Sequence, residues 1–249
     1  MNPLAMDPMR THVDTYLPVL EEIASGKRDL PAVRHPLGFL CLPLLREGPD
    51  GVCVHLFGGD DRHTTDVPPL HAHSWELRSH VLYGEVGNVR VRIRDDTDTP
   101  THRVFEVRSG PDGVDEIRPT ARLVRGQEGP VRRSPAGETY ALGAGEFHTT
   151  VVTPGRSAAT LVLGRSLPGG RDLSLGPLDG PPRRTVRRLY GTEATMRAVR
   201  TALGDPSGVT STRDVAGEFW HVVGMYRFQP GELDEYLPGV RRLPLGEEL

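Results

Sequence analysis

Apolar residues recur at every third or fourth position between residues 8 and 25, with charged residues between them. This spacing predicts one amphipathic helix that ends near Gly26. From Gly38 onward the pattern changes to short runs of β-forming residues, bounded by clusters of Gly, Pro, Asp and Ser. The runs predict strands at residues 38–45, 52–57, 79–83, 88–94, 102–108, 121–125, 139–142, 149–152 and 158–163. Many short strands separated by turns favour an all-β barrel or double-sheet jelly roll.

Two segments are less regular. Residues 95–135 carry Asp, Gly and Pro clusters and predict an elaborated hairpin with solvated tips, and residues 168–184 predict a linker. A second helix is expected from Thr192, as its cap, to Leu203. The expected organisation is therefore an N-terminal helix packed on the barrel (1–30), the barrel (31–170) and a C-terminal extension with one helix (171–249).

Composition narrows the function classes. The net charge of −3 makes nucleic acid an unfavourable partner. No stretch approaches the ~20 apolar residues of a membrane span, and the first ten residues lack the apolar core of a signal peptide, so a cytoplasmic location is expected. Only Cys41 and Cys53 are present, and we expect both to be reduced and buried.

The candidate chemistry lies in three histidines. His71 and His73 are two positions apart on an expected strand, so their imidazoles project from the same face. His148, in a Gly-x-x-His turn about 75 residues later, could join them from a neighbouring strand. Three such ligands hold a divalent first-row metal and leave positions open for a substrate and dioxygen.

The chain resembles the cupin superfamily on these residues. The first cupin motif, His-x-His followed by a strand that ends at a glycine, corresponds to His71, His73 and Gly84, and the second corresponds to Gly145 and His148. The resemblance covers residues 38–163 and implies a cupin double-stranded β-helix, a jelly-roll barrel with a metal inside. Thiol dioxygenases, cupins with three histidines and no glutamate, are similar in outline. The resemblance implies Fe(II), with Zn, Mn, Ni and Cu as alternatives.

The acidic ligand departs from the cupin pattern. Leu77 occupies the usual position of the metal glutamate, and Glu76 stands one residue before it. Because a shift of one residue turns a side chain to the opposite face of a strand, three histidines are favoured over a site that includes Glu76. Tyr140 and Tyr83 are the candidate catalytic residues beside the metal, because a phenol can donate a hydrogen bond or hold a substrate carboxylate.

The expected function is that of a mononuclear metal-dependent cupin enzyme. An iron(II) oxygenase or dioxygenase is favoured, with dioxygen and a small polar, metal-chelating thiol, amino acid or keto acid as substrates. A non-oxidative isomerase, lyase or cyclase and a non-catalytic small-molecule-binding module are the alternatives. A homodimer formed through edge strands is also expected.

Overall fold

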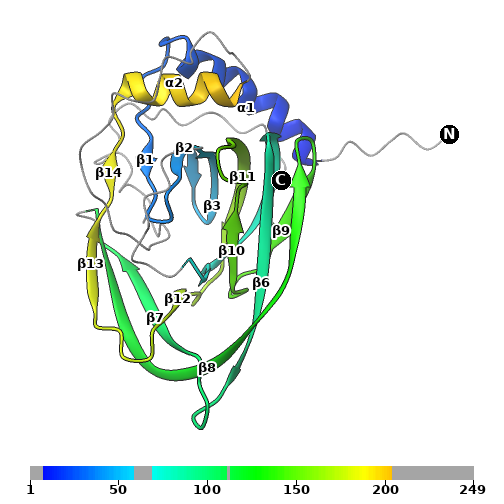
Figure 1. Ribbon diagram of the computed structural model, residues 1–249. Helices are drawn as coiled ribbons and strands as arrows, with labels where there is room; N and C mark the ends of the chain where they lie inside the picture. Colours follow the sequence, from blue (N-terminus) through cyan, green and yellow to red (C-terminus); the bar gives the residue numbers. More distant parts are fainter. Residues whose placement is uncertain (1–7, 59–68, 111–112, 204–249) are drawn as a thin grey trace, which may run out of the picture.

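The strands of the chain form two antiparallel sheets that enclose one interior (Figure 1). The computed structural model describes residues 8–58, 69–110 and 113–203. Sheet A contains, in spatial order, β14 (Arg188–Leu189), β1 (Val33–Arg34), β2 (Leu40–Glu47), β3 (Asp50–Phe57), β11 (Ala158–Ser166), β5 (Trp75–Tyr83) and β9 (Thr139–Leu142). Sheet B contains β13 (Arg183–Val186), β8 (Val114–Pro135), β6 (Glu85–Asp95), β10 (His148–Val151), β4 (His71–Ala72), β12 (Asp172–Gly176) and β7 (His102–Ser109). This architecture confirms the predicted all-β class.

Two helices cover the outer face of sheet A (Figure 1). Helix α1 (Pro8–Ala24) and helix α2 (Thr192–Ala202) pack against each other, and their apolar side chains join those of β2, β3 and β11 in one buried cluster. Strand alternation explains the arrangement. Val52, Val54 and Leu56 face the helices, so the residues between them, Cys53 and His55, face the interior.

Three local predictions differ from the structure. The expected linker at 168–184 contains β12 and β13, and β12 pairs with both β4 and β7 inside sheet B. Thr192 is the first residue of α2 rather than its cap, and its hydroxyl donates a hydrogen bond to Asp29. The segment 95–135 does form a hairpin, but its second strand, β8, is 22 residues long. The first part of β8 pairs with β13 and β7, and the second part pairs with β6. Residues 204–249 of the expected extension lie outside the described residues.

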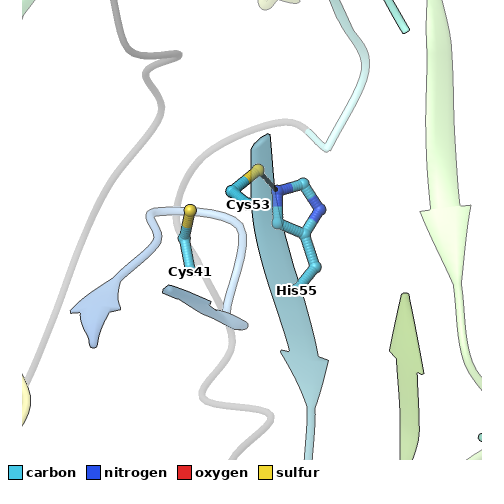
Figure 2. Close-up of side chains that lie close together, drawn as sticks. All are labelled: Cys41, Cys53 and His55. Carbon is cyan, nitrogen blue, oxygen red and sulfur yellow. Dashed lines mark hydrogen bonds between the residues drawn. The ribbon is translucent and has the colours of Figure 1, made fainter. Parts of the chain in front are cut away.

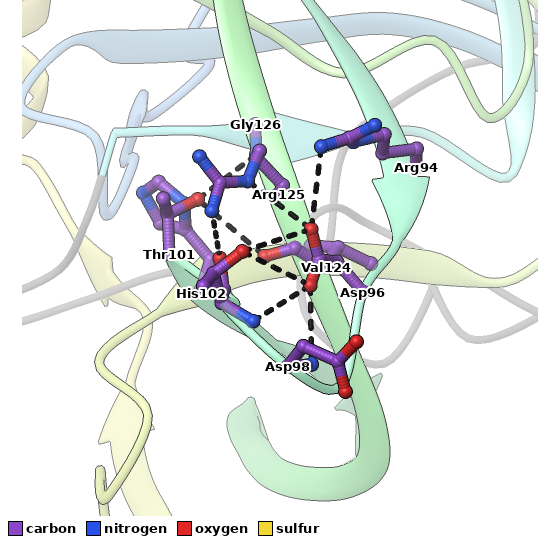
Figure 3. A network of polar contacts seen from close by, with 9 residues as sticks. Arg94, Asp96, Asp98, Thr101, His102, Val124, Arg125 and Gly126 are labelled. Atoms are coloured by element: carbon purple, nitrogen blue, oxygen red, sulfur yellow. Dashed lines mark hydrogen bonds and ion pairs between the residues drawn. The ribbon is translucent and has the colours of Figure 1, made fainter.

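One carboxylate organises the turn between β6 and β7 (Figure 3). Asp96 accepts hydrogen bonds from the backbone N–H groups of Asp98 and Thr99, and it forms ion pairs with Arg94 and Arg125. The Thr99 N–H and then the Arg125 guanidinium hold the pKa of Asp96 below its ordinary value. The solvated tip is therefore an ordered turn.

Gly84 occupies a backbone position that other residues cannot adopt without strain. Its φ is +73°, and a Cβ there would collide with the backbone oxygen of Ser157. We expect Gly84→Ala to lower the free energy of unfolding by at least about 2 kcal/mol. Gly145→Ala is the matched control, because its φ is +74° but a Cβ would meet nothing within 4 Å. Equal losses in urea unfolding of the two variants would contradict this account.

Candidate metal centre

Two strands of sheet B bring the three histidines together. His71 on β4 lies directly opposite His148 at the start of β10. His73 follows β4 by one residue, and its carbonyl accepts a hydrogen bond from the N–H of Gly145 at 2.8 Å. The two motifs, which are 75 residues apart in the sequence, are thus joined by backbone pairing.

The three imidazoles form a compact, buried cluster. Their ring centroids are 4.3 Å apart for His71 and His148, and 4.8 Å apart for each pair that includes His73. One nitrogen of each ring lies within 4.8 Å of those of the other two, and the residues are 5%, 5% and 1% exposed. Ligand nitrogens around a first-row metal are separated by about 3–3.5 Å, so a small closing movement would complete such a site.

Backbone carbonyls set the orientation of two of the rings. The Nδ1–H of His71 donates to the carbonyl of Pro69 at 2.8 Å, and the Nδ1–H of His148 donates to the carbonyl of Glu146 at 2.9 Å. Because Nδ1 carries the proton in each of these two rings, Nε2 keeps a free lone pair that can bind a metal. The buried Nδ1 of His73 has no hydrogen-bond partner within the described part of the chain.

All three histidines are held neutral. Burial, followed by the influence of His148, lowers the pKa of His71 to about 3. Burial also lowers the pKa of His73 well below its ordinary value and lowers that of His148. Neutral imidazole is the form that binds metals. The donor set and the partnerless nitrogen of His73 therefore both fit a bound divalent ion.

The turn that carries His148 is braced from outside the barrel. Glu146 forms an ion pair with Arg90 at 2.7 Å and accepts the N–H of Gly143, while Arg90 also donates to the carbonyl of Ala141. Arg90 is exposed, as are Arg78 and Arg92, so these arginines do not line the interior. Among the described residues, the arginine that lines the interior is Arg46, which the sequence did not single out.

The triad lies in the wall of a cavity of about 450 Å³. Much of the remaining wall is apolar or aromatic, and it includes Leu37, Phe39, Phe57, Trp75, Leu142 and Val162. The Trp75 ring lies against His73, with centroids 4.9 Å apart. Such a wall suits a substrate with an apolar body.

Glu76 does not face the triad. It is exposed on β5, between the buried residues Trp75 and Leu77, and it lies opposite Arg165 on β11. The pKa of that arginine is raised chiefly by its hydrogen bond and ion pair with Asp50, and to a smaller extent by the charge of Glu76. Strand alternation, which disfavoured Glu76 as a ligand, accounts for its outward direction.

The two candidate tyrosines have different positions. Tyr140 lines the cavity on β9 opposite Ser79, and burial raises the pKa of its phenol. Tyr83, at the end of β5, is 40% exposed and is not among the cavity residues. The pairing of β5 with β11 contains an extra residue at Leu82, and this bulge ends the alternation that would have turned Tyr83 inward. The expectation that Tyr83 lies beside the metal is therefore wrong.

His55 also lines the cavity. Cys41 and Cys53 are free and buried, as expected, and they lie in the same wall. The meeting of Cys41 with Cys53 and His55 was missed because it depends on the register of β2 against β3.

Comparisons with known proteins find only distant similarity. No family model and no curated protein matches the sequence. The matching solved structures include the polyketide cyclase RemF from Streptomyces resistomycificus, with 18% identity, a TM-score of 0.32, and coverage of 73% of this chain and 93% of that one. The Cnp3 cupin domain of Schizosaccharomyces pombe has 8% identity, a TM-score of 0.30, and coverage of 52% and 61%. The DMSP lyase DddQ from Ruegeria pomeroyi has 19% identity, a TM-score of 0.28, and coverage of 58% and 50%.

These scores are too low to say anything about the activity of this chain.

No helix within the described residues has the length and apolar character needed to cross a membrane. Fold and site together define a barrel of two antiparallel sheets in which three buried histidines are placed so that they could hold one metal ion.

Proposed function

We propose that the protein is a mononuclear metal-dependent enzyme whose substrate chelates the metal and fills the apolar cavity. The observation that carries the proposal is the cluster of three neutral, inward-facing imidazoles in a largely apolar wall. Iron(II) with dioxygen is the first reaction type to test. A bound metal would supply Lewis-acid activation of the substrate and, if it is iron, activation of dioxygen.

The protein itself contributes orientation and charge. The carbonyls of Pro69 and Glu146 hold His71 and His148 with Nε2 directed away from those bonds. Because all three ligands are neutral, a divalent ion keeps its full charge, which favours a substrate that brings an anionic oxygen or sulfur donor. The aromatic and aliphatic walls exclude water and position the apolar body of the substrate. This refines the expectation of a small polar substrate.

Tyr140 is the candidate proton donor, because its phenol is part of the cavity wall that also holds the triad. With its pKa raised by burial, the phenol stays protonated at neutral pH and can donate to a substrate oxygen. We expect Tyr140→Phe to lower kcat at least about 100-fold with an unchanged metal content. Tyr83→Phe, at the exposed tyrosine, should leave kcat unchanged. Similar activities of the two variants would remove Tyr140 from the mechanism.

A non-oxidative lyase, isomerase or cyclase is the second candidate. It is favoured by the free thiols of Cys41 and Cys53, because they share the cavity with the triad, where a reaction with dioxygen would bring an oxidant next to them. A reaction that does not use dioxygen would spare them.

Oxygen uptake separates the two candidates. The full chain, purified anaerobically and loaded with Fe(II), is exposed to thiols, keto acids and aromatic enols while dioxygen consumption and product formation are measured. Oxygen uptake that depends on substrate supports an oxygenase. Product formation without uptake supports the non-oxidative enzyme. No conversion with Fe(II), Mn(II), Ni(II) or Zn(II) would contradict the proposal and favour a binding module.

A further inference from the structure

A second group of metal-binding side chains lies in sheet A, in the wall of the same cavity (Figure 2). Cys53 and His55 are two positions apart on β3, so both face the interior. Cys41 on β2 lies directly opposite His55 in the strand pairing. None of the three belongs to the histidine triad, and the proposed reaction does not use them.

The distances suit a single ion. The Sγ of Cys53 lies 3.3 Å from Nε2 of His55, and the two sulfurs and one ring nitrogen all lie within 4.8 Å of one another. In a tetrahedral zinc site, bonds of about 2.0–2.3 Å place neighbouring ligand atoms about 3.5–3.8 Å apart. An ion could therefore replace the hydrogen bond between Cys53 and His55 with only small side-chain movements.

The three side chains of this cluster are also preorganised for binding an ion. Cys41 and Cys53 are 3% and 7% exposed, and they are free thiols. The ring of His55 packs against Phe39 at 4.5 Å and against Phe57 at 6.3 Å between centroids, which restrains its rotation. Because the surrounding strands fix all three side chains, little conformational entropy is lost when an ion binds.

We propose that Cys41, Cys53 and His55 form a second metal site that takes Zn(II) through two thiolates and one imidazole. Thiolate ligands select thiophilic ions, whereas the three imidazoles of the triad accept a wider range. Two thiolates neutralise the charge of a divalent ion. Three protein ligands leave the fourth position to water or to a substrate group in the cavity. The site rests on this cluster alone and stands whether or not the triad is catalytic.

Cobalt(II) is the probe, because thiolate ligands produce a cobalt charge-transfer band in the near ultraviolet and imidazoles alone do not. The full chain is reduced, stripped with a chelator and titrated anaerobically, and its two thiols are counted after unfolding. We expect the protein to bind two equivalents of Co(II), of which only the one at the cysteine cluster produces the charge-transfer band. Zn(II) should displace this Co(II) and remove the band. Cys53→Ser and, separately, Cys41→Ser should bind one equivalent less and lose most of the band.

Two controls distinguish the sites. His148→Ala should keep the band, because it removes a triad ligand only. His35→Gln, which removes another histidine of the cavity wall, should keep both equivalents and the band. The proposal is overturned if fully reduced wild-type protein shows no thiolate band at saturating Co(II). It is equally overturned if a serine variant binds two equivalents with an undiminished band.

Discussion

Replacing His148 by alanine is expected to lower the affinity of the triad for its metal at least about 100-fold. Loss of an outer hydrogen-bond partner of a ligand alone costs 10- to 100-fold, and removal of the ligand should cost more. His148 is 1% exposed, and it is the residue that joins β10 to β4 at the site. The backbone pairing does not need the imidazole, so the metal-free variant should stay folded, with a loss of less than about 3 kcal/mol in the free energy of unfolding.

The affinity is best measured by competition with a chromophoric chelator in a Cys53→Ser background, so that the second cluster does not contribute. His35→Gln in the same background is the matched control, because it removes a buried cavity histidine outside both clusters. The metal affinities of the two variants should therefore differ at least about 100-fold. If His148→Ala instead unfolds the protein, the histidine is structural and the account of the site is wrong.

Replacing Asp115 by alanine should produce the largest loss of stability, about 3–5 kcal/mol in the free energy of unfolding. Asp115 is fully buried on β8 and pairs with Arg187, whose side chain is 6% exposed, at 3.4 Å. Removing the carboxylate leaves a buried guanidinium without its countercharge. Arg187 also binds the carbonyls of Gly110 and Gly113, so the change is expected to loosen the β7–β8 hairpin where it meets the segment between β13 and β14.

Urea unfolding of the metal-free protein measures this effect. Asp95→Ala is the control, because Asp95 also pairs with an arginine, Arg122 at 2.7 Å, but its side chain is 72% exposed. An exposed pair contributes at most about 1 kcal/mol. Replacing both partners, as in Asp115→Leu with Arg187→Met, should recover much of the loss. Equal losses for Asp115→Ala and Asp95→Ala would contradict this explanation.

Local sequence rules predicted the features that depend on the alternating direction of side chains along a strand. The common face of His71 and His73 and the outward direction of Glu76 both follow from the period of a strand. The β-rich texture between turn clusters predicted the all-β class. The placement of His148 came from motif resemblance, because no local rule connects residues 75 positions apart.

What the sequence did not predict depends on register and pairing. Strand β12 was missed because its Gly- and Pro-rich flanks are typical of a linker, and its partners β4 and β7 lie about 70 to 100 residues earlier in the chain. Tyr83 was misplaced because a bulge at Leu82 shifts the pairing with β11. Cys41 meets Cys53 and His55 only through the register of two strands, which composition and spacing do not specify.

The two clusters share one cavity. The triad from sheet B and the cluster of Cys41, Cys53 and His55 from sheet A line one space of about 450 Å³, together with Arg46 and Tyr140.

Elemental analysis of the anaerobically purified Cys41→Ser, Cys53→Ser double variant tests the central claim most directly, because the triad is then the one intact metal-binding cluster among the described residues. The account predicts close to one first-row metal ion per chain after exhaustive dialysis, and none when His148→Ala is added. Absence of bound metal, even after reconstitution of the folded double variant with Fe(II), Mn(II), Ni(II) and Zn(II), would contradict it.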